Sequence, residues 1–165
     1  MSLAASQPAV HARQAVHAPH GAANALDGYF SIKVAEDVFG LPVTRVQTIF
    51  RIGLVTLAPG APRDIVGLVN LRGRIVTAVS LRRRLGLVPE ASGALAIGVE
   101  HAGEAFALLV DEIGDVLSLA ADSAIAPPPH IARRRAKFAS SYHRIDGRIL
   151  PLLNIDAVFD FSGDR

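Results

Sequence analysis

The sequence predicts a mainly β protein, of barrel or sandwich type, built from two related halves that each end in a short helix. Short β-type runs alternate with turn residues over most of the chain. Hydrophobic residues make up 50% of the composition, and two blocks of sequence recur in the same order. A chain of 165 residues can bury a self-sufficient core, in one domain or in two small domains that share it.

The composition argues against several function classes. The chain has no cysteine, so it forms neither disulfides nor cysteine-ligated zinc sites. Its net charge of +2 is small, whereas nucleic-acid-binding proteins usually carry a larger excess of base. No apolar run approaches the length that spans a bilayer, and the first residues lack a basic segment followed by an apolar one. We therefore expect a soluble, cytoplasmic protein that does not insert into a membrane.

Residues 1–27 are rich in Ala, His, Pro and Gln and show neither helical nor strand periodicity. We expect a disordered tail. The tail contains His11, His17 and His20. We interpret them as solvated side chains, because no scaffold holds them together; metal binding is the alternative.

Short strands are predicted from residue 29 onward, each bounded by turn residues. They are Tyr29–Ala35, Val43–Phe50, Leu54–Leu57, Ile65–Leu71, Arg74–Val79, Leu95–Glu100, Glu104–Val110, Ile113–Leu119 and Arg148–Leu153. Pro59–Pro62 breaks the pattern, and Pro127–Pro129 is extended outside any strand ladder. His101–Gly103 and Asp146-Gly147 are predicted hairpin turns, since glycine readily adopts the positive φ that such turns require.

The internal repeat is the most informative feature of the sequence. Val38–Phe50 aligns with Ala105–Leu117, and Gly73–Leu81 aligns with Gly147–Ile155. In the first pair of segments the identical residues are Phe39, Leu41 and Val43, opposite Phe106, Leu108 and Val110. Two matches in the same order indicate a duplication. The first half spans about 28–89 and the second about 94–161, and exchange of strands between them is compatible with this pattern.

Each half is predicted to end a strand in a short helix. Ser80 and Asn154 occupy equivalent positions, and their side-chain oxygens can accept hydrogen bonds from free amides at a helix start. Apolar residues then recur four positions apart, at Leu81 with Leu85 and at the equivalent pair in the second half. The arginine run at 82–84 is interpreted as a solvated helical face, with a patch for an anionic partner as the alternative.

The predicted strand Arg74–Val79 carries apolar side chains on both faces. Ile75 and Val79 share one face, and Val76 and Ala78 share the other. Either the strand is buried on both sides between the halves, or its outer face binds another protein. Both interpretations stay open at this point.

Residues Ile65–Arg82 resemble the signature of the CheW-like family, in which two hydrophobic strands flank Asn-Leu-Arg-Gly. The tetrapeptide is Asn70-Leu71-Arg72-Gly73 in this chain, and the second strand ends in Ser-Leu-Arg where the family has Asp-Leu-Arg. Segments upstream, from Phe39 to Ile49, and downstream, from Leu108 to Val116, also resemble family segments. The resemblance covers residues 28–162, which is nearly everything outside the tail.

This resemblance implies two five-stranded β-barrel subdomains packed on a shared hydrophobic seam. It also implies a non-enzymatic adaptor that couples the cytoplasmic tips of methyl-accepting chemoreceptors to the regulatory domain of the chemotaxis histidine kinase, in membrane-associated receptor arrays. That kinase domain has the same fold, so one barrel can pack on another, and Val76 and Ala78 become the candidate kinase contact. No cofactor, metal or catalytic residue comes with the family. We expect the free adaptor to be a monomer.

The resemblance also marks candidate receptor-contact residues. Arg72 joins two predicted strands, so its guanidinium can offer several donors to a receptor tip; hydrogen bonding to carbonyls of its own barrel is the alternative. Asn70 belongs to the same motif. Val46 and Gly67 match positions near the receptor-facing groove, although Gly67 can also serve tight backbone packing. Thr48 stands where the family often has an acidic residue.

Two other functions compete with the adaptor. A small basic β-barrel that binds nucleic acid would account for the arginines clustered at 72–84 and 133–135, but no aromatic residue lies in either cluster for base stacking. The second competing function is that of a divergent CheW-like scaffold in a non-flagellar signalling pathway. The sequence has no phosphate-binding glycine loop, no Gly-x-Ser-x-Gly motif and no His-Glu-x-x-His pair. We therefore expect no enzymatic activity.

Overall fold

The computed structural model describes residues 28–88 and 95–163, so the predictions for residues 1–27 lie outside the described residues. The first half contains β1 (Gly28–Val34), β2 (Asp37–Pro42), the 3-10 helix η1 (Val43–Arg45), β3 (Val46–Arg51), β4 (Val55–Thr56), β5 (Ile65–Leu71), β6 (Arg74–Ser80) and α1 (Leu81–Arg84). The second contains β7 (Leu95–His101), β8 (Glu104–Val110), β9 (Glu112–Ser118), η2 (Ala121–Ser123), β10 (Ala124–Ile125), α2 (Arg133–Ala136), β11 (Ala139–Ile145), β12 (Arg148–Leu153) and α3 (Ile155–Val158).

The described residues run twice through the same series of elements. In each half a hairpin, β1–β2 or β7–β8, leads to a third long strand and then to a two-residue strand. A second hairpin, β5–β6 or β11–β12, follows and ends in a one-turn helix. The sequence repeat therefore corresponds to a repeat of structure. Helix α2 belongs to the second half and has no counterpart among the described residues of the first.

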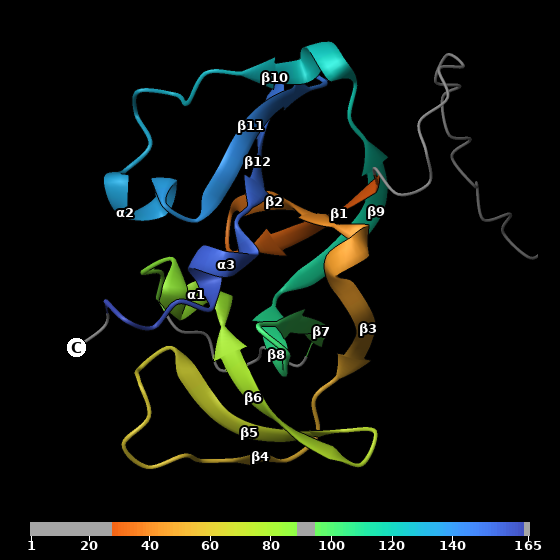
Figure 1. The fold of residues 1–165 in the computed structure, drawn as a ribbon. Helices are drawn as coiled ribbons and strands as arrows, with labels where there is room; N and C mark the ends of the chain where they lie inside the picture. Colours follow the sequence, from red (N-terminus) through yellow and green to blue (C-terminus); the bar gives the residue numbers. More distant parts are fainter. Residues whose placement is uncertain (1–27, 89–94, 164–165) are drawn as a thin grey trace, which may run out of the picture.

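Each sheet combines strands from both halves (Figure 1). The hydrogen-bonded order is β10-β11-β12-β2-β1-β9 in sheet A and β3-β7-β8-β6-β5-β4 in sheet B. The hairpin that opens each half is therefore paired with strands of the other half, because β2 lies parallel to β12 and β8 lies parallel to β6. Each sheet has five long strands and a two-residue strand at one edge, and the predicted mainly β fold is confirmed.

Among the described hairpins, three turn through two residues that both have positive φ. They are Arg72-Gly73 (51° and 86°), Ala102-Gly103 (51° and 81°) and Asp146-Gly147 (48° and 76°). This is type I′ geometry, whose twist matches that of antiparallel strands. The hairpins predicted at His101–Gly103 and Asp146-Gly147 are therefore confirmed.

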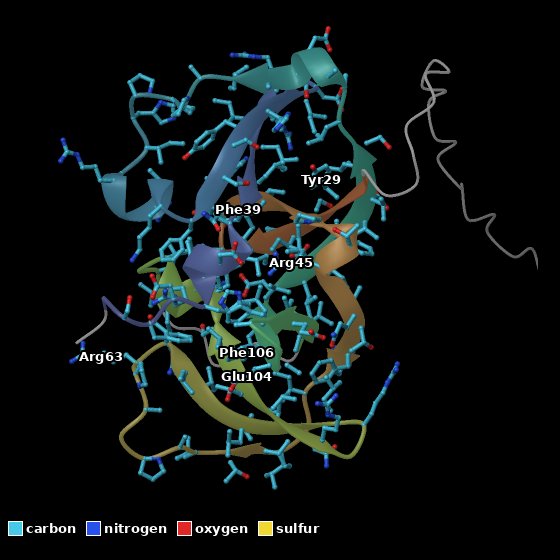
Figure 2. The ribbon with its side chains drawn as sticks, in the orientation of Figure 1. Tyr29, Phe39, Arg45, Arg63, Glu104 and Phe106 are labelled. Atoms are coloured by element: carbon cyan, nitrogen blue, oxygen red, sulfur yellow. The ribbon has the colours of Figure 1, made fainter. Side chains whose placement is uncertain are left out.

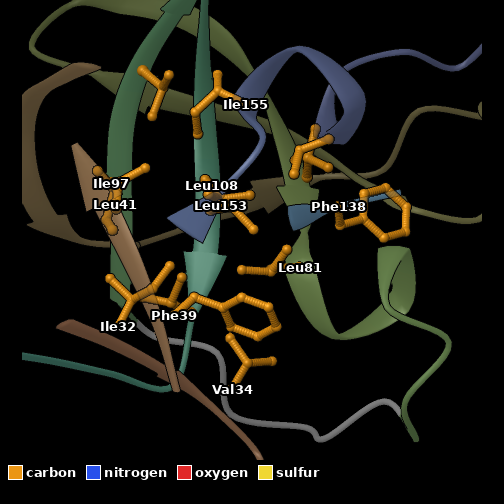
Figure 3. Close-up of a cluster of buried hydrophobic side chains, with 14 of the residues drawn as sticks. Ile32, Val34, Phe39, Leu41, Leu81, Ile97, Leu108, Phe138, Leu153 and Ile155 are labelled. Atoms are coloured by element: carbon orange, nitrogen blue, oxygen red, sulfur yellow. The ribbon is translucent and has the colours of Figure 1, made fainter. Parts of the chain in front are cut away.

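The main core lies where the two sheets and two of the helices meet (Figure 3). Leu41 of β2, Leu108 of β8 and Leu153 of β12 are each at most 2% exposed and belong to one cluster. Leu81 of α1 and Ile155 of α3 pack into the same cluster. Because both halves contribute to this core, each stabilises the other by burying apolar surface that would otherwise face water.

A second core cluster belongs to sheet B. Its buried members are Val69, Val76, Ala78, Ala96, Ala107 and Leu109. Val76 is 5% exposed and Ala78 is 0% exposed. Val79, on the other face of β6, belongs to the main core. The second part of β6 is therefore buried on both faces, which is the first of the two interpretations considered for this strand.

Both predicted helix caps are confirmed. The Ser80 hydroxyl accepts a hydrogen bond from the Arg83 amide at 3.3 Å, and Asn154 Oδ1 accepts one from the Ala157 amide at 3.2 Å. Each bond satisfies an amide that has no partner within its own helix. The halves thus end in the same way, in a capped turn that places Leu81 or Ile155 in the core.

The predicted solvated face at 82–84 is wrong. Helix α1 is only four residues long and packs against β8 and the C-terminal segment, so its side chains are drawn into the protein. Arg84 is 2% exposed. Arg82 donates to both carboxylate oxygens of Asp111, from Nε at 2.8 Å and from Nη2 at 2.6 Å. Two of these arginines are therefore structural.

The strand predicted at Val43–Phe50 begins later, at Val46. Strand β2 ends at Pro42, and a 3-10 turn follows before β3 begins at Val46. Proline lacks the amide that would continue the ladder, which accounts for the break. Strands β2, β10 and β11 and helix α2 were not among the predicted elements. Strand β11 is rich in Ser, His and Arg, and α2 is a single turn.

Candidate functional site: the β5–β6 hairpin tip

The Asn-Leu-Arg-Gly motif forms the tip of the β5–β6 hairpin. Asn70 Oδ1 accepts a hydrogen bond from the Gly73 amide at 2.8 Å, which closes the turn on itself. Arg72 has a φ of 51°, a conformation that residues other than glycine rarely adopt. Both Asn70 and Arg72 are exposed. The motif therefore builds a rigid turn that presents one guanidinium to solvent.

Arg72 bridges two opposite parts of sheet B. Its Nη2 donates to the Thr48 hydroxyl at 3.3 Å, and Thr48 lies on β3, at one edge of the sheet. The hairpin tip belongs to β5 and β6, near the other edge. Figure 1 shows the tip lying beside the end of β3. Sheet B is therefore curled so that the predicted residues Arg72 and Thr48 meet.

Arg72 was interpreted from the sequence either as a receptor contact or as a donor to carbonyls of its own barrel. Arg72 bonds to a side-chain hydroxyl, whereas the alternative required backbone carbonyls of its own barrel. A guanidinium has five N–H donors, and the bond to Thr48 uses one of them. At 3.3 Å this hydrogen bond is long, and it lies on the surface. It orients the guanidinium and leaves the other donors of the group available.

Thr48 and Val46 face inward rather than outward. A Cβ on Gly98 of β7 would come within 2.8 Å of the Thr48 methyl group and 3.4 Å of Leu71 Cδ2. Thr48 therefore packs over a glycine, next to the base of the tip. Val46 is half-buried against the main core. Neither side chain offers as much accessible surface as Arg72.

Gly67 lies away from the tip, in the middle of β5, and is buried. Its φ is 152°, and a Cβ there would collide with the backbone carbonyl of Thr56 and lie 2.9 Å from Val55 Cγ1. The glycine thus allows β4 to approach β5 closely. The geometry of Gly67 therefore favours a role in tight backbone packing over direct contact with a receptor.

The assignment of the kinase contact to Val76 and Ala78 needs correction. Both side chains are buried in the second core cluster, because their face of β6 points into sheet B. The apolar residue of β6 that does reach solvent is Ile75, which is 65% exposed and pairs with Asn70 across the hairpin. Sequence alternation placed Ile75 with the core residue Val79. It could not show that the hairpin extends beyond the core.

A polar network at the junction of η1, β7 and α3 was not predicted. Arg45 Nη2 lies 3.5 Å and His101 Nδ1 lies 3.2 Å from Asp156 Oδ1, which joins η1, β7 and α3. Gln47 Nε2 donates to Glu100 Oε2 at 2.8 Å. Figure 2 shows Arg45 at the level where the two sheets meet. These residues lie far apart in sequence and belong to no motif, so sequence alone gave no signal for them.

A second electrostatic link fixes the hairpin β1–β2. Asp111, between β8 and β9, accepts the Arg82 bonds and also accepts a bond from the Ala35 amide at 2.6 Å. The hydrogen bonds from Arg82 hold the pKa of the Asp111 carboxyl below its usual value, against a smaller opposing effect of burial. This carboxylate of the second half therefore ties together the opening hairpin and the helix of the first half.

Residues 28–88 and 95–163 contain no group of three His, Cys, Asp or Glu side chains placed to hold a metal ion. Within the same ranges, no helix is long and apolar enough to cross a bilayer. What the hairpin tip offers is a fixed, exposed cation flanked by an apolar side chain, which suits recognition of another protein.

Comparisons with known proteins agree with this geometry. Residues 28–162 match the family model described as "CheW-like domain". The chain is 30% identical to a chemotaxis protein CheW of Rhizobium meliloti and 28% identical to a probable chemotaxis protein CheW of Rhizobium etli; each match covers 78% of this chain and 84% of the relative. The crystal structure of the scaffolding protein TtCheW from Thermoanaerobacter tengcongensis superposes with a TM-score of 0.73 at 24% identity, over 83% of this chain and 94% of the other. The chain therefore belongs to the CheW-like family.

Proposed function

We propose that this chain is a non-enzymatic adaptor that couples methyl-accepting chemoreceptors to the chemotaxis histidine kinase. Its curated relatives are named chemotaxis proteins CheW, and a structural neighbour is named a scaffolding protein. The adaptor works at the cytoplasmic face of receptor arrays, through the receptor tips and the regulatory domain of the kinase. The observation that carries the receptor half of this proposal is the exposed guanidinium of Arg72 on a rigid turn.

The receptor contact centres on Arg72. The turn fixes its backbone and Thr48 fixes its side chain, so little conformational entropy is lost when a carboxylate or carbonyl of a receptor helix binds. Asn70 contributes by closing the turn and Thr48 by orienting the guanidinium. Ile75, next to the tip, adds apolar surface. Val46 and Gly67 support this surface from within the sheet.

The kinase contact is assigned to the β4 edge of sheet B. Leu54 is 87% exposed and Leu57 is 78% exposed, and the two flank β4. Large apolar side chains with this exposure are typical of surfaces that another protein covers. Replacing both leucines with lysine is expected to abolish kinase binding, while receptor binding through Arg72 persists.

The arginine clusters favour a protein partner over nucleic acid. Arg82 and Arg84 are held by Asp111 and Asp64, and Arg135 lies 2.8 Å from Asp37. Internal pairs therefore neutralise arginines that phosphate binding would need. A gel-shift assay at moderate salt is expected to show no retardation of DNA or RNA.

The test reconstitutes the full chain with receptor-containing membranes and the histidine kinase. Arg72→Ala is expected to weaken binding to receptors by about 1–3 kcal/mol, as for an interfacial arginine, and to reduce receptor-stimulated kinase autophosphorylation. The matched control is Arg63→Ala: Arg63 is also exposed but precedes β5, whereas Arg72 follows it. Sedimentation with the membranes measures binding, and thermal unfolding checks the fold.

Three outcomes would contradict the proposal. If the unaltered chain sedimented with neither receptors nor kinase, the adaptor function would be wrong. If Arg72→Ala unfolded the chain, the residue would be structural and the site misplaced. Equal weakening by Arg63→Ala would mean that net charge, rather than the hairpin tip, governs binding.

A further inference from the structure

A cavity of about 890 Å³ lies beside sheet A, away from the β5–β6 tip. Its walls come from the β1–β2 turn, from β11 and β12, and from the segment that carries α2. Slightly more than half of their surface is apolar, from side chains that include Phe39, Leu117, Tyr142, Ile149, Leu150 and Pro151. Sites for small molecules usually have a volume of a few hundred to about a thousand Å³ and apolar walls with a few polar groups. In size and lining the cavity meets this description.

The cavity follows from a difference between the two parallel seams. In sheet B, β6 pairs with β8 over four consecutive residues, from Thr77 to Ser80. In sheet A, the equivalent strands β12 and β2 pair only at Leu152 with Gly40. Pro151 occupies the position equivalent to Thr77, and Pro42 ends β2. Neither proline can donate to the ladder, so the hydrogen-bonded ladder of this seam is shorter than the one in sheet B.

A longer connection then provides the opposite wall. Residues 126–138 join β10 to β11 and include α2, whereas only residues 57–64 join the equivalent strands β4 and β5. Ile131 and Ala132, from the longer connection, line the cavity. The ion pair between Arg135 and Asp37, at 2.8 Å, holds this connection against the start of β2. The equivalent connection in the first half is shorter and contains no helix.

Tyr142 gives the cavity a polar group without a partner. It lines the cavity and is 5% exposed, and its hydroxyl makes no hydrogen bond with the described part of the chain. Burial raises the pKa of this phenol above its usual value, so the group stays protonated and remains a donor. The hydroxyl oxygen stays accessible within the cavity, so its donor is open to a ligand. A bound acceptor would take the place of solvent at this donor.

The charges around the cavity show no preference for either sign. Glu36, Asp37 and Asp146 contribute negative charge, and Arg135 and Arg148 contribute positive charge. Arg135 is already paired with Asp37. A charged ligand would meet opposite and like charges together, whereas an uncharged one would lose little hydration on entering.

We propose that this cavity binds an uncharged, mainly apolar small molecule that presents one hydrogen-bond acceptor to the Tyr142 hydroxyl. The apolar walls would exclude water from the body of the ligand, and Tyr142 would select for the acceptor. This site is separate from the receptor contact at Arg72 and from the kinase contact at Leu54 and Leu57. Its test therefore does not depend on the adaptor function.

The experiment titrates the full chain with prodan, an uncharged naphthalene dye whose acceptor is a carbonyl group and whose emission moves to the blue in dry surroundings. Saturable binding of one dye per chain with blue-shifted emission is expected. Tyr142→Phe keeps the ring and removes the hydroxyl, so it is expected to weaken prodan binding roughly 3–10-fold, the value of one hydrogen bond. A competing analogue with the carbonyl reduced to methylene is expected to bind the unaltered chain and Tyr142→Phe equally.

A second pair of variants tests the location. Ile149→Trp adds bulk to the cavity wall and is expected to weaken prodan binding about tenfold or more. Ile75→Trp makes the same change at the equivalent position of β6, outside any described cavity, and is expected to leave binding unchanged. Equal effects of the two tryptophans, or unsaturable binding, would place the dye on the surface and overturn the proposal. Unchanged prodan affinity in Tyr142→Phe would overturn the acceptor that it assigns.

Discussion

Arg84 and Asp64 form an ion pair across the base of α1, with Nη1 and Oδ2 2.9 Å apart and side-chain exposures of 1% and 13%. The same guanidinium donates to the carbonyls of Ala157 and Asp160, at 2.9 and 2.7 Å. Its carbon lies 5.2 Å from the centre of the Phe138 ring. One buried cation therefore links the first half to the end of the second.

Replacing Arg84 with leucine tests this link. The substitution is expected to lower the free energy of unfolding by about 3–5 kcal/mol, because Asp64 is left as a nearly buried charge without its partner. Two carbonyls of the C-terminal segment lose their donor as well. Urea unfolding followed by circular dichroism measures the change.

Two further variants test whether the lost ion pair causes this destabilisation. Arg83→Ala removes the neighbouring arginine, whose exposed side chain donates to the Arg63 carbonyl, and is expected to change stability by less than about 1 kcal/mol. Combining Arg84→Leu with Asp64→Leu is expected to recover part of the loss, since no unpaired charge remains. No recovery in the double variant would mean that the carbonyl contacts dominate.

Stability is expected to fall on the acid side through Asp111. Its pKa is lowered in the folded protein by the bonds from Arg82. Its contribution is therefore complete above the ordinary aspartate pKa of about 4 and is lost as pH falls through the lower folded value. Asp111→Asn is expected to reduce the free energy of unfolding by about 1.5–3 kcal/mol at pH 7. The difference from the unaltered chain should shrink steadily below pH of about 4.

The neighbouring carboxylate provides the control for this pH series. Glu112 is mostly exposed and pairs with Lys33 at 3.1 Å. Surface pairs of this kind contribute little, so Glu112→Gln is expected to change stability by less than about 1 kcal/mol at any pH. A pH dependence that Asp111→Asn leaves intact would assign the acid sensitivity to other groups.

Two glycines of β5 and its turn are expected to respond differently to alanine. Gly73→Ala meets open space, so only its positive φ matters, and a loss of about 1–2 kcal/mol is expected. Gly67→Ala adds a collision with the Thr56 carbonyl, so a loss of about 3 kcal/mol or more is expected. Thermal melts of both variants provide the comparison. If Gly67→Ala were as stable as the unaltered chain but failed to bind receptors, Gly67 would be a contact residue after all.

The two helix caps allow a matched test of the repeat. Ser80→Ala and Asn154→Ala each remove one side-chain bond to a helix amide, so each is expected to lose about 1 kcal/mol of stability. Ser80→Asn imports the cap of the other half and is expected to keep most of it. Urea denaturation measures all three. A loss in only one half would show that the caps differ in importance despite their equivalent geometry.

Local chemistry in the sequence was enough to predict several parts of the fold. Asp146-Gly147 specified a two-residue hairpin because only certain residues tolerate its dihedral angles. Ser80 and Asn154 specified helix starts because their oxygens reach free amides. The motif at Asn70 and Arg72 located the exposed tip, because a turn must end the two strands that flank it.

Features that depend on distant partners could not be predicted in this way. Val76 and Ala78 read equally well as buried or as partner-binding, since periodicity gives the face of a strand but not what covers it. The meeting of Arg72 with Thr48 depends on how sheet B curls. The arginines of α1 were predicted to be solvated because no acidic residue lies near them in the sequence. Their partners, Asp64 and Asp111, are distant in the chain and reach α1 only in the folded protein.

The exchange of hairpins sets an order in which the protein can fold during synthesis. Sheet B has all its strands once β9 begins to emerge, because β7 and β8 join strands that are already made. Sheet A cannot be completed until β12 emerges, although β1 and β2 leave the ribosome first. Strand β2 therefore meets its partner β12 only near the end of translation, although β1 can pair with β9 earlier, and contacts so distant in sequence form slowly. The free edge of β2 would stay exposed to chaperones until β12 is made.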